Sequence, residues 1–319
     1  MESFVTGVAQ MGPIQKSDSR ASVVKRLLAL LAEAKARGCR FVVFPELTLT
    51  TFFPRWVYQI GEPALEAWFE ETMPGPDTRS LFEAAAAAGI GFYLGYAEKA
   101  GDKRFNTAIL VTEMGRIVGK YRKVHLPGHV EPDPKRLGEH LEKRYFHIGD
   151  LGFPVFEAFG ARIGMCICND RRWPETYRVM GLQGVELVAL GYNTPTGLGE
   201  PYQAAAQANA HNELSLRAGA YQNATWVAGA AKCGVEEGFP MIGQSMIVSP
   251  LGEVVAQAAS LDDELITARC DMRLAAYART EIFNLARHRR PEAYRLITER
   301  VGVGPLVQPT RAEMGLPDA

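Results

Sequence analysis

Three apolar segments of the sequence each end in a side chain that could take part in acyl transfer. "FVVFPE" ends in Glu46, "VGKYRK" ends in Lys123 and "IGMCIC" ends in Cys168. A thiolate nucleophile needs a proton acceptor, which Glu46 could supply. The oxyanion formed by attack on a carbonyl needs a fixed positive charge, which Lys123 could supply beside the backbone N–H of Asn169. Together these groups are the minimum set for acyl transfer through a thioester.

The segment "GMCICNDRRWPET" at 164–176 could also contain a disulfide, a metal ligand or a core cysteine. Five cysteines are an odd number for a disulfide framework, and a reducing compartment disfavours one. Cys166 and Cys168 form C-x-C without a second Cys/His pair at the spacing of zinc sites, so we expect no metal and no cofactor. Cys166, two residues earlier on the same strand face, is expected to pack as a small apolar side chain. Cys168 is therefore the candidate nucleophile.

The elements that must position these residues follow an alternating pattern of strands and helices. Apolar runs at 4–11 and 40–46 read as strands, and residues 18–38 and about 201–221 read as helices. A Glu-Met-Gly turn and a "PLGE" turn predict hairpins, and hence mixed sheets. There are more strands than one small sheet needs, so we predict an α/β protein with two packed sheets and helices outside. Functional side chains are expected in loops at the carboxyl ends of its strands.

Composition limits the classes of protein to which the chain could belong. With 319 residues, 35 Lys and Arg, and 36 Asp and Glu, the net charge is −1 and no basic block stands out. Nucleic acid is therefore not an expected partner. No apolar stretch is long enough to span a bilayer, and the N-terminus lacks a signal-peptide pattern, which predicts a cytoplasmic protein without membrane contact. Without repeats or linkers, residues 1–319 read as a single domain with its core at about 4–280.

Three motifs in order resemble the carbon–nitrogen hydrolase (nitrilase) superfamily: "FPELTLT", "GKYRKVHLPGH" and "CICNDRRWPE". The resemblance covers about residues 4–280 and implies an α-β-β-α sandwich, two mixed sheets flanked by helices. It implies that Glu46 is the general base, Lys123 the oxyanion stabiliser and Cys168 the nucleophile. Glu142, in "EHLEKRYF", matches a second glutamate of the superfamily that would orient Lys123 or the substrate. The alternative for Glu142 is a solvated charge on a helix.

Within this superfamily, "NDRRWPE", "TTFFPRW" and "LGYNTPT" are similar to N-carbamoyl-D-amino acid amidohydrolases. The similarity implies a small-molecule substrate with a free carboxylate, which a forked guanidinium can grip by both oxygens. Arg171 and Arg172 follow the nucleophile closely enough to do this. A structural ion pair or a helix-end charge is the alternative for each. Asn193 matches a substrate-contacting asparagine, and a turn role before Thr-Pro is its alternative.

The same similarity adds three histidines and an oligomer. His125, His140 and His211 match histidines of these amidohydrolases, and we interpret them as pocket-shaping or hydrogen-bonding residues. The loops at 130–138 and 197–210 differ from those of the relatives, which leaves side-chain preference and D-stereochemistry open. Residues 281–319 resemble extensions that cross dimer interfaces, so a homodimer or homotetramer is expected.

Other activities remain alternatives from the sequence alone. A β-ureidopropionase-like, aliphatic amidase or nitrilase activity would share the triad, but a nitrile would need no carboxylate clamp. A papain-like enzyme is disfavoured, because its cysteine lies near the mature N-terminus and precedes its histidine. A non-catalytic scaffold is the alternative outside enzymes.

Overall fold

The computed structural model describes residues 3–136, 138–196 and 205–316. The chain divides into two compact units, Met1–Phe283 and Asn284–Ala319. None of the helices in the described ranges is long and apolar enough to cross a membrane.

The first unit contains two six-stranded sheets. One sheet has the order β14-β1-β2-β3-β4-β5, with β1 (Ser3–Gln10), β2 (Cys39–Val43), β3 (Gly91–Ala100), β4 (Lys103–Val111), β5 (Ile117–Arg122) and β14 (Glu264–Asp271). The other has the order β13-β12-β9-β8-β7-β6, with β6 (Val155–Ala158), β7 (Ala161–Ile167), β8 (Leu187–Tyr192), β9 (Trp226–Ala231), β12 (Met246–Val248) and β13 (Val254–Gln257). Strands β1, β2 and β3 pair in parallel, as do β7, β8 and β9, while the hairpin strands pair antiparallel. Both sheets are mixed, as predicted.

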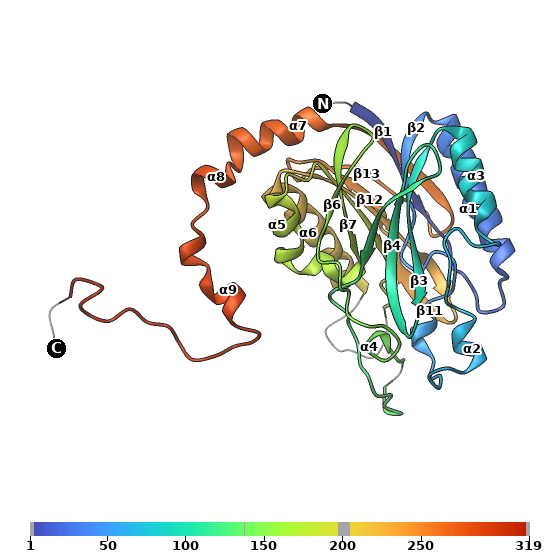
Figure 1. The fold of residues 1–319 in the computed structure, drawn as a ribbon, viewed down its shortest axis with the longest axis horizontal. Coiled ribbons are helices and arrows are strands. Elements are labelled where there is room, and N and C mark those ends of the chain that lie inside the picture. The colour runs from blue at the N-terminus through green and yellow to red at the C-terminus, as the bar shows by residue number, and fades with distance from the viewer. Residues whose placement is uncertain (1–2, 137, 197–204, 317–319) are drawn as a thin grey trace. The chain divides into compact units, whose positions relative to one another are not determined.

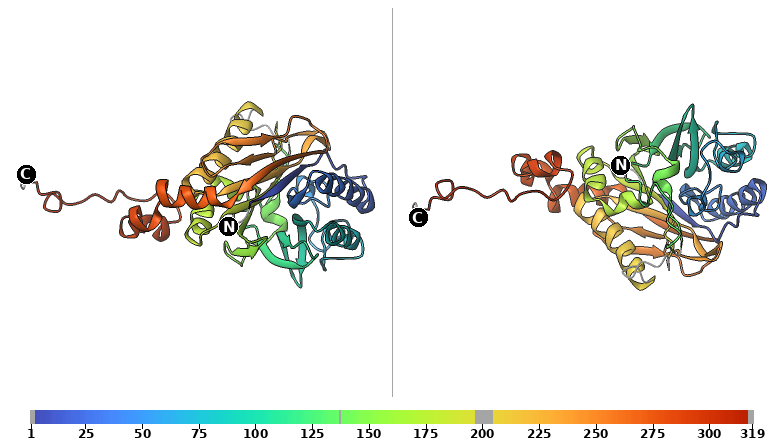
Figure 2. Two further views of the ribbon diagram at one scale, coloured as in Figure 1. Left: turned by 90° about the horizontal axis from the view of Figure 1, so that it is seen from above. Right: turned by 90° about the horizontal axis from the view of Figure 1, so that it is seen from below.

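Helices cover the outer faces of the two sheets. On one side lie α1 (Arg20–Ala36) and α3 (Arg79–Ala88), and on the other lie α5 (Pro174–Leu182) and α6 (Ala205–Asn223) (Figure 1). Seen from above and below, the blue and teal helices and the yellow-green and gold helices enclose the strands (Figure 2). The predicted α-β-β-α sandwich is therefore confirmed. The start of the helix expected at 201–221 lies outside the described residues.

Local sequence explains why α1 forms where it does. The Ser19 hydroxyl accepts a hydrogen bond from the backbone N–H of Ser22, at 3.1 Å, and caps the first turn. Gly38, with φ of 71°, adopts the left-handed conformation that ends the helix. The buried residues recur at helical spacing and pack on the first sheet: Val23, Val24, Leu27, Leu30, Leu31 and Ala34.

Shorter elements complete the first unit. They are α2 (Pro63–Glu66), α4 (Glu142–Tyr145), α7 (Met272–Tyr277), the hairpin β10 (Cys233–Glu236) with β11 (Phe239–Ile242), 3₁₀ turns at Phe53–Arg55 and Cys168–Arg172, and a π turn at Ala278–Ile282.

Two glycines and a tyrosine bring the sheets close together where Glu46 lies. A Cβ atom at Gly191 would stand 2.5 Å from the Glu46 nitrogen, and one at Gly95 would stand 2.7 Å from the Pro45 oxygen. A side chain at either position would therefore clash with the backbone of Pro45 and Glu46, and only glycine leaves room for that segment between β3 and β8. The Tyr93 hydroxyl donates to the Cys166 carbonyl at 3.0 Å and accepts from the Gly191 N–H at 3.2 Å. These contacts fix the strand that precedes Cys168 against the sheet that carries Glu46.

The second unit contains α8 (Leu285–His288), a 3₁₀ turn at Pro291–Ala293 and α9 (Arg295–Glu299), followed by irregular chain. Several of its apolar side chains are exposed, among them Val301, Val303 and Leu306. The unit begins three residues after the predicted boundary at 281. Its place at an oligomer interface stays a prediction.

Candidate active site

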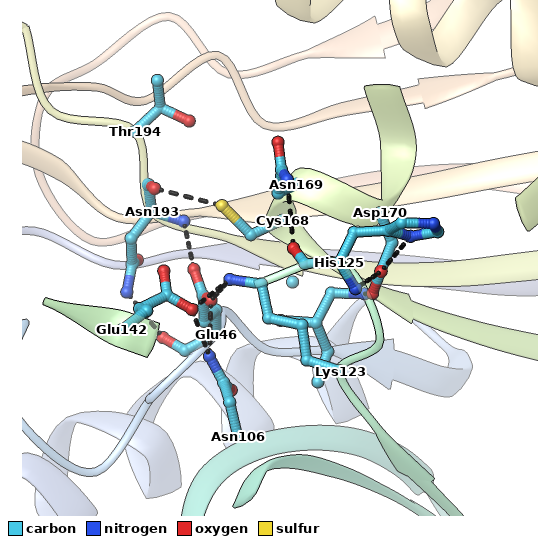
Figure 3. Close-up of polar contacts among 12 residues, drawn as sticks. Glu46, Asn106, Lys123, His125, Glu142, Cys168, Asn169, Asp170, Asn193 and Thr194 are labelled. Carbon is cyan, nitrogen blue, oxygen red and sulfur yellow. Dashed lines mark hydrogen bonds and ion pairs between the residues drawn. The ribbon is translucent and has the colours of Figure 1, made fainter. Parts of the chain in front are cut away.

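Glu46, Lys123 and Glu142 form a buried ion cluster between the two sheets. Lys123 Nζ lies 2.7 Å from Glu46 Oε1 and 2.6 Å from Glu142 Oε2, and none of the three side chains is exposed. Figure 3 shows Cys168 above this cluster. The structure thus brings the three residues of the predicted triad together. Glu142 is no solvated helix charge, because its carboxylate is fully buried against the lysine.

Asn106 ties the cluster to β4, and the sequence analysis missed it. Its side-chain amide donates to Glu46 Oε1 at 2.8 Å and to Glu142 Oε2 at 3.4 Å. Its backbone carbonyl accepts a hydrogen bond from the backbone N–H of Lys123 at 2.8 Å. The available signal was an asparagine inside the apolar strand "FNTAILV", where that residue type is depleted.

The charges of the cluster support one another. Burial alone would lower the pKa of the Lys123 ammonium, but the carboxylates of Glu142 and Glu46 raise it above its usual value. Burial alone would raise the pKa of Glu142, but the Lys123 charge and the hydrogen bond from His140 lower it to about 2. At neutral pH, Lys123 is therefore a fixed cation and Glu142 a fixed anion.

Cys168 occupies a strained turn at the exit of β7. Strand β7 ends at Ile167, and Cys168 has φ of 48°, a conformation that non-glycine residues rarely adopt. Its thiol donates to the carbonyl of Asn193 at 3.3 Å. Burial and the Glu46 carboxylate raise the pKa of this thiol to about 11, against the opposing charges of Lys123 and Arg171. The resting thiol is therefore protonated at neutral pH and needs a base to react.

Cys166, in contrast, is a core residue. Its side chain has no exposed area and packs in the cluster between the two sheets. Burial raises the pKa of its thiol well above the usual value. Its packing role, expected from the sequence, fits this position.

Asn193 holds Glu46, the residue expected to act as the base. Its backbone N–H donates to Glu46 Oε2 at 2.9 Å, and its side-chain amide donates to the Glu46 carbonyl at 3.0 Å. Among the described residues, its side-chain oxygen has no hydrogen-bond partner, although the residue is buried. Asn193 therefore orients Glu46 and leaves one acceptor free.

A pocket of about 200 Å³ opens beside Cys168. Arg171 lines it, but its guanidinium is held by the protein: Nε donates to Asn212 at 3.0 Å, Nη1 to the Cys168 carbonyl at 2.7 Å and Nη2 to Thr194 at 3.0 Å. The lining residues are Pro127, Gly128, His129, Arg136, Gly138, His140, Cys168, Asn169, Arg171, Arg172, Asn193, Thr194 and Pro195. The described hydrogen-bond partners of Arg171 are thus neutral rather than an ion pair, and its contact with a substrate stays a prediction.

Arg172 also lines the pocket and differs from its neighbour. It is exposed, and within the described ranges its guanidinium has no hydrogen-bond or ion-pair partner. Partial desolvation of the guanidinium, together with the charge of Arg171, still lowers its pKa. The charge of an anion in the pocket would act against both effects, because it would stabilise the charged guanidinium.

The three predicted histidines have different surroundings. His140 lines the pocket, and its Nε2 lies 2.9 Å from Glu142 Oε1. His125 lies outside the pocket lining, with Nδ1 2.8 Å from Asp170 Oδ1. His211 is exposed on α6 and is not among the pocket-lining residues. Only His140 is brought to the pocket.

The remaining lining residues complete the account of the predicted site. Asn169 lines the pocket and donates its side-chain amide to the His125 carbonyl at 3.0 Å. His129 and Arg136 also line it, and neither was predicted as a site residue; Arg136 belongs to the loop at 130–138, which differs from that of the relatives. Of the loop expected at 197–210, residues 197–204 lie outside the described structure. Across the part of the chain that the structure describes, no three His, Cys, Asp or Glu side chains group as metal ligands would.

Comparisons with known proteins agree with this geometry. Residues 6–280 match the family described as Carbon-nitrogen hydrolase. The chain is 32% identical over 287 residues to a nitrilase from Pyrococcus abyssi, covering 89% of this chain and 97% of that protein. It is 27% identical over 293 residues to an N-carbamoylputrescine amidase from Arabidopsis thaliana, covering 88% and 91%. A crystal structure of a carbon-nitrogen hydrolase from Helicobacter pylori G27 superposes with a TM-score of 0.80 at 25% identity, covering 94% and 99%.

The protein therefore belongs to the carbon–nitrogen hydrolase family. It is a hydrolase that acts on carbon–nitrogen bonds other than peptide bonds, as the superfamily resemblance predicted.

Proposed function

We propose that the protein hydrolyses the ureido C–N bond of N-carbamoyl-D-amino acids, releasing the D-amino acid, carbon dioxide and ammonia. The observation that carries this proposal is Arg172, whose guanidinium lines the same pocket as Cys168 and has no partner among the described residues. A substrate carboxylate would accept two parallel hydrogen bonds from it. The motifs around Cys168 and Asn193 support the N-carbamoyl-D-amino acid class by their similarity to those amidohydrolases.

The charge of the pocket favours an anionic substrate over the alternatives. Arg136 and Arg172 line it, and none of its described lining residues is Asp or Glu. N-carbamoylputrescine carries an ammonium group, which such a pocket would repel. A simple nitrile would leave Arg172 without a partner.

The first half-reaction joins Cys168 to the ureido carbon. Glu46 accepts the thiol proton while the sulfur electron pair attacks the carbonyl carbon. Lys123 stabilises the charge that develops on the carbonyl oxygen. The C–N bond then breaks, and the leaving nitrogen takes the proton from Glu46. A carbonyl group remains bound to Sγ.

Water completes the turnover. Glu46 accepts a proton from water, the resulting hydroxide attacks the bound carbonyl, and the C–S bond breaks as the thiol regains its proton. The carbamic acid that is released decomposes to an amine and carbon dioxide. In sum, one N-carbamoyl amino acid and one water give one amino acid, one carbon dioxide and one ammonia.

The experiment is a comparison of Arg172 variants on charged and neutral substrates. Arg172→Ala should lower kcat/KM for an N-carbamoyl-D-amino acid by about 10²-fold, because charge-assisted hydrogen bonds are lost. Arg172→Lys keeps the charge without the fork and should lose less. The N-carbamoyl amino acid amide should be hydrolysed equally by parent and variants. Arg116→Ala, which removes an exposed arginine from the β4–β5 turn, is the matched control.

Two results would contradict the proposal. Unchanged kinetics of Arg172→Ala on the acid would remove the carboxylate clamp and favour a plain amidase or nitrilase. Equal losses on acid and amide would mean that Arg172 only holds the turn together. Assays of D- and L-enantiomers side by side test the proposed stereochemistry.

A further inference from the structure

We propose that Asp170 is a positioning residue that fastens the Cys168 turn to the segment carrying Lys123, and so aligns nucleophile and oxyanion stabiliser. The inference rests on the proposed thiol chemistry of Cys168, but not on the identity of the substrate. Asp170 lies within the motif "CICNDRRWPE", but it was not among the predicted site residues and is not one of the described pocket-lining residues.

The Asp170 carboxylate contacts four hydrogen-bonding groups. The side chain is fully buried. Oδ1 accepts the backbone N–H of His125 at 2.9 Å and faces His125 Nδ1 at 2.8 Å. Oδ2 accepts the Tyr121 hydroxyl at 2.7 Å and the backbone N–H of Ile167 at 3.0 Å. Figure 3 shows the contacts to His125 beside the lysine.

The positions of these groups in the chain show which two segments Asp170 joins. Tyr121 and His125 stand two residues before and two residues after Lys123. Ile167 directly precedes Cys168. One carboxylate thus joins both sides of the lysine to the end of β7. Lys123 and Cys168 follow strands of different sheets, so this contact directly fixes the position of one relative to the other.

A second contact joins the same two segments. The Asn169 side chain donates to the His125 carbonyl at 3.0 Å. The His125 ring stacks on Trp173 and Phe153, with centroids 5.1 and 5.8 Å apart. Two aromatic rings therefore pack on His125, whose Nδ1 faces Asp170. This explains its place outside the pocket lining.

The alignment matters because both partners tolerate little displacement. An oxyanion donor must lie within about 3 Å of the developing charge, and a displacement of about 1 Å costs on the order of 10²-fold in rate. Cys168 also occupies a strained conformation that persists only where surrounding contacts determine it. The bond from the Ile167 N–H to Asp170 is such a contact, one residue before the strain.

Asparagine cannot replace this carboxylate. The Tyr121 hydroxyl and the two backbone N–H groups all donate to Asp170, whereas an amide offers one accepting oxygen and one donating nitrogen. At least one donor would lose its acceptor.

The experiment compares Asp170→Asn, Tyr121→Phe and the control Tyr96→Phe. Tyr96 is a buried tyrosine of β3, in the same sheet as Tyr121, and its hydroxyl is not among the Asp170 contacts. Asp170→Asn should lower kcat by about 10²-fold, and Tyr121→Phe by about tenfold, with KM changed little. Tyr96→Phe should match the parent. Circular dichroism checks folding, and Tyr121→Phe keeps the test valid where Asp170→Asn does not fold.

A second readout uses no substrate. The rate of Cys168 alkylation by iodoacetamide at pH 8 should fall in Asp170→Asn and Tyr121→Phe, because a displaced Lys123 no longer lowers the pKa of the thiol. Parental kcat and parental or faster alkylation in a folded Tyr121→Phe would overturn the inference. A parent protein that fails to hydrolyse N-carbamoyl-D-amino acids would sink the proposed function alone, since alkylation still decides the role of Asp170.

Discussion

Two buried lysines, Lys123 and Lys232, show how similar positions acquire different chemistry. Each follows a strand, and neither side chain is exposed. Lys123 lies between two carboxylates, and its pKa is raised. Lys232 contacts the single carboxylate of Glu236, which Arg55 shares at 2.7 Å, and burial lowers its pKa. The ratio of carboxylates to cations therefore determines how firmly a buried lysine holds its charge.

The two clusters also differ in what they contact. The Lys123 cluster lies beside Cys168, whereas the Lys232 cluster is bonded to backbone. Lys232 donates to the Thr50 carbonyl, and Glu236 accepts the backbone N–H of Phe52 at 2.7 Å. The second cluster thus holds the loop that follows Glu46. In the proposed mechanism the first cluster takes part in chemistry, whereas the contacts of the second cluster are with the backbone of the structure around it.

The largest expected effect tests the site beside the first cluster. Cys168→Ala should lower kcat by about 10⁶-fold, the order found when a nucleophile is removed, while the protein still folds. Cys166→Ala, two residues earlier on β7, should retain most activity because its thiol is confined to the core. Steady-state kinetics on both variants make the comparison. The reverse pattern would show that Cys166, and not Cys168, is the nucleophile.

Exchange of each lysine for methionine tests the contrast between the clusters. Lys123→Met should lower kcat by about 10²–10³-fold, because an oxyanion donor is lost. Lys232→Met should leave kcat per folded molecule unchanged, and should lower the free energy of unfolding by about 3–5 kcal/mol because a buried ion pair is broken. Urea unfolding and active-site thiol titration separate the two readouts. A catalytic loss in folded Lys232→Met as large as that in Lys123→Met would break the distinction.

A smaller effect concerns acid stability. Burial acts to raise the pKa of Glu142, yet Lys123 and His140 lower it from its usual value near 4.5 to about 2. A carboxylate with a depressed folded pKa stabilises the protein fully above about pH 4.5, and that stabilisation is lost as pH falls towards 2. The free energy of unfolding should therefore fall across this window, by an amount on the order of 3 kcal/mol. Glu142→Gln should show a shallower fall, and an equal slope in both proteins would contradict the assignment.

The two lysines also show how far the sequence could be interpreted. The strand "ATWVAGAAK" ends in Lys232 just as "VGKYRK" ends in Lys123, so the strand-end position alone could not distinguish them. The ordered motifs around Glu46, Lys123 and Cys168 could, and the alternating pattern with its hairpin turns was enough for the sandwich. Local periodicity was therefore enough to predict the fold, and the order of the motifs was enough to predict which three residues the structure brings together.

Residues that act through long-range contacts were beyond such reasoning. Asn106 and Asp170 matter because they bond across strands and across sheets, which no local spacing reveals. Arg171 and Arg172 are adjacent, chemically identical and both line the pocket, yet Arg171 is held by internal partners and Arg172 has none among the described residues. That difference depends on the direction of each side chain in the turn after Cys168.

The most direct test of the catalytic account is a search for the covalent bond to Cys168. The parent protein is mixed with an N-carbamoyl-D-amino acid, quenched in acid during turnover, and digested for peptide mass spectrometry. We expect an added mass on the peptide that contains both cysteines, assigned to Cys168 by fragmentation and missing in Cys168→Ala. A carbamoyl mass would show that the amino acid leaves first, and a larger mass that retains the amino acid would show that ammonia does. Turnover that continues while Cys168 stays unmodified at every quench time, or an adduct on Cys166, would contradict the account.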